Sequence, residues 1–111
     1  MREHWKAVTG YQDYYEVSNL GNVRSLPRIV PHARYGSIKL KGKQLIPICG
    51  QNGSSVIVGL FFEGVRYRVP IARLVWEAFI DAPTPKLIGH WDGDRFNNSL
   101  LNLKPIGSKI S

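Results

Sequence analysis

The stretch from Leu87 to Leu103 carries the side chains of this sequence that are best suited to chemistry. From His90 to Asn102 it places one imidazole, two carboxylates (Asp92 and Asp94) and three carboxamides. This inventory is typical of a small metal site with oxygen and nitrogen ligands, and equally of a tightly hydrogen-bonded turn. His90 is therefore either a partly solvated general base or a side chain that only caps the turn.

Local signals predict the elements that hold these side chains. The apolar pair Leu87-Ile88 indicates a short strand that ends at His90. Asp92-Gly93-Asp94 consists of residues that tolerate left-handed backbone, which favours a turn. Asn97-Asn98-Ser99 offers helix N-caps ahead of a leucine-rich run, so a helix is expected to begin there.

The same stretch belongs to a longer pattern. The chain resembles the HNH endonucleases of phage and homing type in two runs, Ala72-Arg73-Leu74-Val75-Trp76-Glu77-Ala78-Phe79 and Gly89-His90-Trp91-Asp92-Gly93 onward to Asn102-Leu103. The family pattern reads roughly H-R-L-V-x-E-A-F, a short linker, then [DN]-H-x-D-G-[ND]-x-x-N-N-x-x-x-N-L.

Near its start, the chain resembles NUMOD4, the module commonly found N-terminal to such nucleases. It shares with that module Trp5-Lys6-Ala7-Val8, Gly10-Tyr11, Tyr14-Tyr15, Val17-Ser18-Asn19 and Gly21-Asn22-Val23-Arg24-Ser25. This match is the more specific of the two because it fixes many positions in order. Together the two resemblances cover most of the chain.

The resemblance to the HNH family implies metal-assisted phosphodiester hydrolysis. In such a site a His at the end of a strand acts as general base on water, while one Mg²⁺ or Mn²⁺ stabilises the phosphorane and the leaving oxygen. Carried over by position, His90 is the general base and Asn102 is the Asn whose carboxamide braces the loop. The candidate metal ligands are His90, Asp92 and Asp94: the two aspartates match ordinary turn positions of the pattern, but they could substitute as ligands, since hard cations accept carboxylates readily.

Three departures from the family pattern indicate a degenerate site. Gly89 stands where the family carries Asp, Asn or His as the first metal ligand, and Ala72 stands where it carries His. The second metal ligand of the family lies roughly two to three helical turns beyond Asn102, and Lys104-Pro105 would break that helix. We therefore expect the helix ligand to be missing and the HNH element to be truncated at its C-terminus.

The composition favours a polyanionic partner. The 111 residues include 15 Lys and Arg against 8 Asp and Glu, a net charge of +7 with a pI near 9.9. Because the basic residues alternate with aromatic and β-branched ones, this surplus points to double-stranded DNA over a merely solvated basic surface.

Six basic side chains are the candidate DNA contacts. Two lie beside a predicted turn, on what should be an exposed edge, and two share a face of a predicted strand at 65–69. Two more lie on the alternating stretch 37–43, opposite Ile38 and Leu40, which should face inward. The six are Arg24, Arg28, Lys39, Lys41, Arg66 and Arg68.

The single cysteine, Cys49, excludes an internal disulfide and a Cys-rich zinc site, and its apolar neighbours predict a buried thiol. No apolar run approaches the length of a membrane span, and the first residues lack the apolar core of a signal peptide. We expect a cytoplasmic protein without a membrane partner, located in a bacterial host if the chain is phage-encoded.

These patterns predict the α+β class, with a small antiparallel sheet domain followed by a short helix and a ββα-metal remnant. A turn at 51–54 and a hairpin over 55–69 precede an amphipathic helix over 71–80, where apolar residues change from alternation to helical spacing. We expect a NUMOD4-like, β-rich DNA-binding module at 1–69 and a C-terminally truncated HNH-like element at 70–111.

Three functions remain open. The first is an active small nuclease that uses His90 with ligands from Asp92 or Asp94, completed if needed by a second subunit. The second is a DNA-binding protein that keeps the fold without the chemistry. The third is a phage-encoded effector that binds a host protein, such as an inhibitor of a host enzyme.

Overall fold

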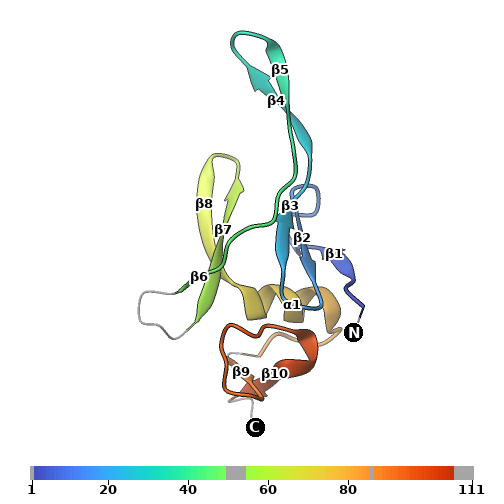
Figure 1. Ribbon diagram of the computed structural model, residues 1–111, viewed down its shortest axis with the longest axis vertical. Coiled ribbons are helices and arrows are strands. Elements are labelled where there is room, and N and C mark those ends of the chain that lie inside the picture. Colours follow the sequence, from blue (N-terminus) through green and yellow to red (C-terminus); the bar gives the residue numbers. More distant parts are fainter. Residues whose placement is uncertain (1, 50–54, 86, 107–111) are drawn as a thin grey trace.

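The computed structural model describes residues 2–49, 55–85 and 87–106, and within them it contains short antiparallel strands and a single α-helix (Figure 1). The strands are β1 (Trp5–Ala7), β2 (Tyr15–Ser18), β3 (Val23–Ser25), β4 (Arg28–His32), β5 (Gly36–Leu40), β6 (Ile48–Cys49), β7 (Val56–Phe62), β8 (Val65–Pro70), β9 (Leu87–His90) and β10 (Leu103–Ile106). The helix α1 spans Ile71–Phe79, and a 3₁₀ turn, η1, spans Leu100–Asn102. This content agrees with the α+β class. The predicted turn at 51–54 lies outside the described residues.

The strands form four small sheets, ordered β1-β2-β3, β4-β5, β6-β7-β8 and β10-β9. One buried apolar cluster joins them around α1, and it includes Val17 of β2, Leu60 of β7, Val75 of α1 and Leu103 of β10. Its members come from both sides of residue 70. The division into 1–69 and 70–111 stays a prediction, and the two stretches share one core.

The N-terminal sheet, β1-β2-β3, is a pair of hairpins, and a serine fixes the turn between β2 and β3. The Oγ of Ser18 accepts the backbone N–H groups of Leu20 and Asn22, at 3.2 and 3.1 Å. Gly21 has φ +91°, a left-handed value that glycine adopts without a Cβ penalty. A tight turn over 19–22 therefore joins β2 to β3, and Tyr15 and Val17, alternate residues of β2 on one face, are both buried.

The predicted hairpin over 55–69 and the helix after it are confirmed. Every second residue of β7 from Val56 to Leu60 is buried, and Glu63-Gly64, with φ of 52° and 80°, forms the two-residue turn to β8. Helix α1 begins directly after β8 and packs its apolar face on β1, β2, β7 and β8. It ends at Phe79, one residue earlier than expected.

The hairpin formed by β4 and β5 differs from its prediction. It projects from the rest of the molecule, at the top of the view in Figure 1, and its two strands pair only with each other. Leu40 is 38% exposed and Ile38 is only partly buried, so the inward face expected for these two residues is not a buried surface. Alternation predicts which residues share a face, but it cannot supply a second layer to cover that face.

Two further expectations are wrong. Cys49 is exposed, because β6 is a two-residue strand at the edge of its sheet and its neighbour Ile48 is exposed too. The helix expected to begin after Ser99 is instead η1, followed by β10, which pairs with β9 along its whole length. Within the described ranges, no helix is long and apolar enough to cross a membrane.

Candidate functional site

His90 is the last residue of β9, as its apolar neighbours predicted, and it pairs across the β-ladder with Leu103. The loop from Trp91 to Ser99 leaves β9 and returns through η1. The backbone N–H of Trp91 donates to the carbonyl of Asn102 at 2.8 Å, which closes the base of the loop.

Asn102 and Asp92 hold this loop together. The Oδ1 of Asn102 accepts the backbone N–H of Asp92 at 3.2 Å, and its Nδ2 donates to Asp92 Oδ1 and to the carbonyl of Asn97, both at 2.9 Å. Asp92 also accepts the Nδ2 of Asn97 at 2.9 Å and the N–H of Asp94 at 2.8 Å. These donors, the carboxamide of Asn97 foremost, lower the pKa of Asp92 to about 2. The bracing role expected for Asn102 matches this geometry.

Asn98 orients the imidazole of His90. Its Nδ2 donates to the carbonyl of Arg95 at 3.1 Å, so its Oδ1 faces His90 Nε2 at 2.8 Å. In the neutral ring Nε2 therefore carries the proton, and Nδ1 keeps the free lone pair. Asn98 is only 4% exposed, and the sequence reasoning missed its role. The available signal was the Asn97-Asn98 doublet of the motif, which was interpreted as a helix cap.

The N-terminal sheet supports the loop directly. The backbone N–H of Leu100 donates to the carbonyl of Asn19 at 2.7 Å, and Ser99 Oγ donates to the carbonyl of Leu20 at 3.4 Å. A Cβ on Gly21 would lie 2.9 Å from the backbone carbonyl of Asn98, so only glycine leaves room for this contact. The β2–β3 turn thus sets the position of the residue that orients His90.

A divalent cation does not fit the described side chains near His90. Both carboxylate oxygens of Asp92 accept hydrogen bonds inside the loop, and Asp94 Oδ1 accepts the N–H of Phe96 at 3.0 Å. Gly89 is buried, and Ile106 and Lys104 fill the space where a Cβ would project. Within the described residues no three His, Cys, Asp or Glu side chains gather to hold a metal ion. A pocket of about 290 Å³ beside His90 and Asn98 is lined by Ala72 and Arg73, where the family pattern has His and Arg.

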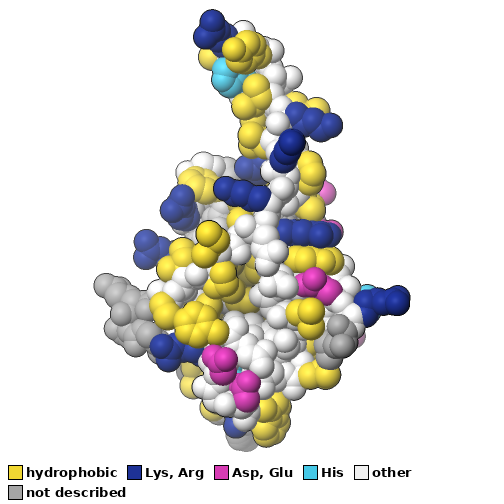
Figure 2. Space-filling model, in the orientation of Figure 1, with side chains coloured by type: hydrophobic (Ala, Val, Ile, Leu, Met, Phe, Trp, Pro, Cys, Tyr) yellow, Lys and Arg dark blue, Asp and Glu magenta, His cyan; other side chains and the backbone are white. Residues whose placement is uncertain are grey.

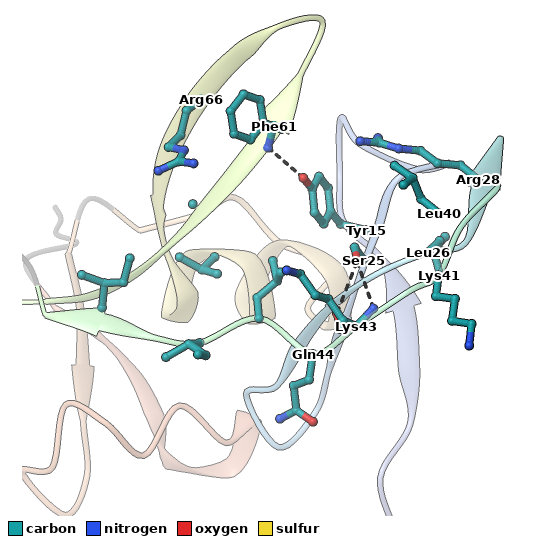
Figure 3. Close-up of a pocket in the computed structure, with 15 residues that line it drawn as sticks. Tyr15, Ser25, Leu26, Arg28, Leu40, Lys41, Lys43, Gln44, Phe61 and Arg66 are labelled. Carbon is teal, nitrogen blue, oxygen red and sulfur yellow. Dashed lines mark hydrogen bonds between the residues drawn. The ribbon is translucent and has the colours of Figure 1, made fainter. Parts of the chain in front are cut away.

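The basic candidates converge at a different place. A groove of about 830 Å³ lies between the β7–β8 hairpin and the segment that runs from β3 through the β4–β5 hairpin to β6 (Figure 3). Among the described residues, its cations are Arg28, Lys41, Lys43 and Arg66, and no Asp or Glu lines it. Figure 2 shows Lys and Arg side chains gathered on this face of the molecule, over both hairpins. We call this hollow the basic groove.

The walls of the basic groove are tied to one another. The backbone N–H of Phe61, on β7, donates to the Oη of Tyr15, on β2, at 2.8 Å. On the other side, Ser25 N–H donates to the carbonyl of Lys43 at 2.8 Å, and Lys43 N–H donates to Ser25 Oγ at 3.1 Å. The Arg66 guanidinium lies 4.8 Å from the Phe61 ring, which holds it at the groove.

The other basic candidates lie elsewhere. Arg24 donates from Nε and Nη2 to one carboxylate oxygen of Glu16, Oε1, at 2.9 and 2.7 Å, and its guanidinium stacks on Trp5 at 3.9 Å. It therefore braces the N-terminal sheet. Lys39 is exposed on the β4–β5 hairpin and Arg68 is exposed on β8, and neither lines the basic groove. Lys43 lines the groove, although it is not among the six candidates predicted from the sequence.

Comparison with known proteins first defines the class. Residues 3–60, more than half of the chain, match the family model of the NUMOD4 motif. The chain therefore belongs to the NUMOD4 family, which confirms the resemblance drawn from its N-terminal residues.

The wider chain is similar to one particular enzyme. It is 32% identical over 108 residues to the DNA endonuclease I-HmuI of Bacillus phage SP01, covering 96% of this chain and 54% of that enzyme. It also matches the solved structure described as DNA binding and cleavage by the HNH homing endonuclease I-HmuI, with a TM-score of 0.68 and 30% identity over 90% of this chain and 50% of that chain. The resemblance to HNH endonucleases is thereby confirmed. The chain spans about half the length of these relatives.

Proposed function

We propose that this chain binds double-stranded DNA, with the sugar-phosphate backbone lying along the basic groove. The observation that supports this most directly is the convergence of four cations, Arg28, Lys41, Lys43 and Arg66, around one hollow without an acidic side chain in its lining. Lys and Arg contacts to phosphates supply sequence-independent affinity for DNA, because each contact releases condensed counterions.

The charge pattern along the chain supports the same proposal. Between Glu16 and Glu63 the sequence contains six Lys and Arg residues and no Asp or Glu. This segment supplies β3, the β4–β5 hairpin and most of the groove wall, so the positive potential is concentrated on one part of the surface. The groove also presents Leu40 and Phe61, which are 38% and 42% exposed and can pack against deoxyribose.

Cleavage of the bound DNA requires more than the described residues offer. His90, oriented by Asn98, has the geometry of a general base whose Nδ1 is free to accept a proton. The side chains around it do not complete a site for Mg²⁺ or Mn²⁺. The function proposed is therefore DNA binding by a relative of an HNH nuclease, with a degenerate catalytic element.

The test is the salt dependence of affinity, measured by fluorescence anisotropy with a labelled duplex. The double variant Lys41→Gln/Arg66→Gln removes two groove cations that make no ion pair with any other described residue. If each contacts one phosphate, the slope of log affinity against log salt should become shallower by about 1.8. The matched control is Arg2→Gln/Lys6→Gln, two exposed cations that do not line the groove. Its slope should stay close to that of the unmodified chain.

Two outcomes would contradict the proposal. If both double variants change the slope equally, the basic groove is not the backbone site. If the unmodified chain shows no affinity for duplex DNA even at low salt, DNA binding itself is refuted, and the alternative of a host protein as partner becomes the hypothesis to pursue.

A further inference from the structure

Besides its four cations, the basic groove is lined mostly by apolar side chains. Ile46 and Ile48 are 81% and 53% exposed, and Leu40 and Phe61 are 38% and 42% exposed. Deoxyribose can cover a part of this surface, but the larger apolar groups of DNA are its bases. Exposed apolar side chains gathered in one hollow therefore indicate a site that also takes bases.

The groove has room for nucleotides but not for a whole duplex. Its volume of about 830 Å³ falls within the range of about 300–1,000 Å³ in which pockets enclose small molecules. A duplex can therefore only lie along the mouth of the groove, held by its phosphates. Paired and stacked bases have their flat faces against one another and cannot reach the apolar lining. The bases of a single strand can enter wherever they are unpaired.

We infer that the basic groove takes bases from a locally unpaired DNA strand and that one of these bases stacks on Phe61. The inference rests on the proposed function, and it specifies the form of DNA that the same groove prefers. Grooves that bind single strands combine cations along the backbone with aromatic rings on which bases stack. Every base has a π-face, so this contact does not require a particular sequence.

Phe61 is held in a position that suits this contact. Its backbone N–H donates to Tyr15 Oη at 2.8 Å, which fixes the residue on β7. Arg66, its cross-strand partner on β8, places its guanidinium 4.8 Å from the centroid of the Phe61 ring. Phe61 is still 42% exposed, so a base can pack on it while Arg66 donates to a neighbouring phosphate. Both side chains lie at the groove, on the wall that faces Arg28 and Leu40 (Figure 3).

The test compares the affinity for a fully paired duplex with that for the same duplex carrying a short run of mismatched pairs at its centre. The mismatched duplex should bind the unmodified chain roughly 5- to 150-fold more tightly, the effect of one stacked base. Phe61→Leu keeps an apolar side chain without the ring and should bring this ratio close to one, whereas Phe61→Tyr should retain it. The matched control is Tyr67→Leu, which should keep the full ratio, because Tyr67 is 43% exposed on the same hairpin but does not line the groove.

A photochemical crosslink provides a second measurement. With 5-iodouracil at the mismatched positions, irradiation should join the DNA to Phe61 of the unmodified chain. Equal affinity for the two DNAs would overturn the inference, although DNA binding would stand. A preference that survives in Phe61→Leu would also overturn it, because the chain would then favour flexible DNA and not a stacked base. If the unmodified chain binds neither DNA, the proposed function has failed instead. The melting temperature of Phe61→Leu should stay near that of the parent, since Phe61 lies outside the buried cluster.

Discussion

A single carboxylate organises the loop that carries the candidate catalytic histidine. Asp92 is exposed, yet it accepts hydrogen bonds from the carboxamides of Asn97 and Asn102 and from the backbone of Asp94. A metal ligand at this position would have to give up these bonds. Asp92 matches an ordinary turn position of the family pattern, and in this structure it has that structural role, as a turn acceptor.

The lowered pKa of Asp92 predicts a pH-dependent contribution to stability. Its pKa falls from the ordinary value of 3.8 to about 2, so the folded state favours the ionised form. The contribution is complete above the unfolded pKa and is lost as pH falls through the folded pKa. Asp92→Asn should therefore lower the melting temperature at neutral pH, and the difference from the parent should shrink below about pH 4.

The matched control for this measurement is Asp81→Asn, an exposed aspartate in the linker after α1. Thermal unfolding of both variants should be followed from neutral pH down to acid. A difference between Asp92→Asn and the parent that stays constant with pH would show that the carboxylate's charge does not stabilise the loop.

The helices and strands that are marked by local sequence signals could be predicted. The hairpin over 55–69 and the helix after it follow from turn residues and from a change in apolar period. The strand β10 could not be predicted, because Leu100, Leu101 and Leu103 mimic helical spacing. What makes the segment a strand is its pairing with β9, a contact across the loop. Sequence reasoning likewise found His90 and Asn102, but not the basic groove, whose cations come from segments far apart in the chain.

The β2–β3 turn and the His90 loop should behave as one unit. Gly21 combines a left-handed φ of +91° with close contact to Asn98, whereas Gly10 has φ +88° and nothing within 4 Å of a Cβ. Gly21→Ala should therefore destabilise the chain more than Gly10→Ala, which carries the backbone strain alone. The difference should be about 1–3 kcal/mol, as expected for an overpacked contact, and is measured by urea unfolding.

NMR spectroscopy distinguishes the loss of the Gly21–Asn98 contact from a general loss of stability. Nitrogen NMR of the His90 ring reports which nitrogen carries the proton, and Gly21→Ala should change that spectrum by moving Asn98 away from Nε2. Gly10→Ala should leave it unchanged. Equal effects of the two substitutions, on stability and on the His90 spectrum, would show that the turn does not position the loop.

The whole molecule joins a basic surface to an HNH-like loop through one core. Residues of β2, β7, α1 and β10 share the buried cluster, so the NUMOD4 sheets and the His90 loop cannot move independently without exposing it. The basic groove and His90 would therefore keep a constant relative position while a duplex is bound. Whether it is cut then depends on the metal ligands that surround His90.

We expect the isolated chain to show at most feeble nicking of supercoiled plasmid with Mg²⁺ or Mn²⁺. In the part of the chain that the structure describes, His90 belongs to no group of three His, Cys, Asp or Glu side chains that could hold a metal ion, and Mg²⁺ gives up its waters reluctantly. Gly89→Asp alone should not restore cleavage, because Ile106 and Lys104 occupy the space for its side chain and a further ligand is still needed. His90→Ala and EDTA are the controls. Robust nicking that EDTA and His90→Ala both abolish would contradict this prediction, and would show that other side chains, or a second subunit, complete the metal site.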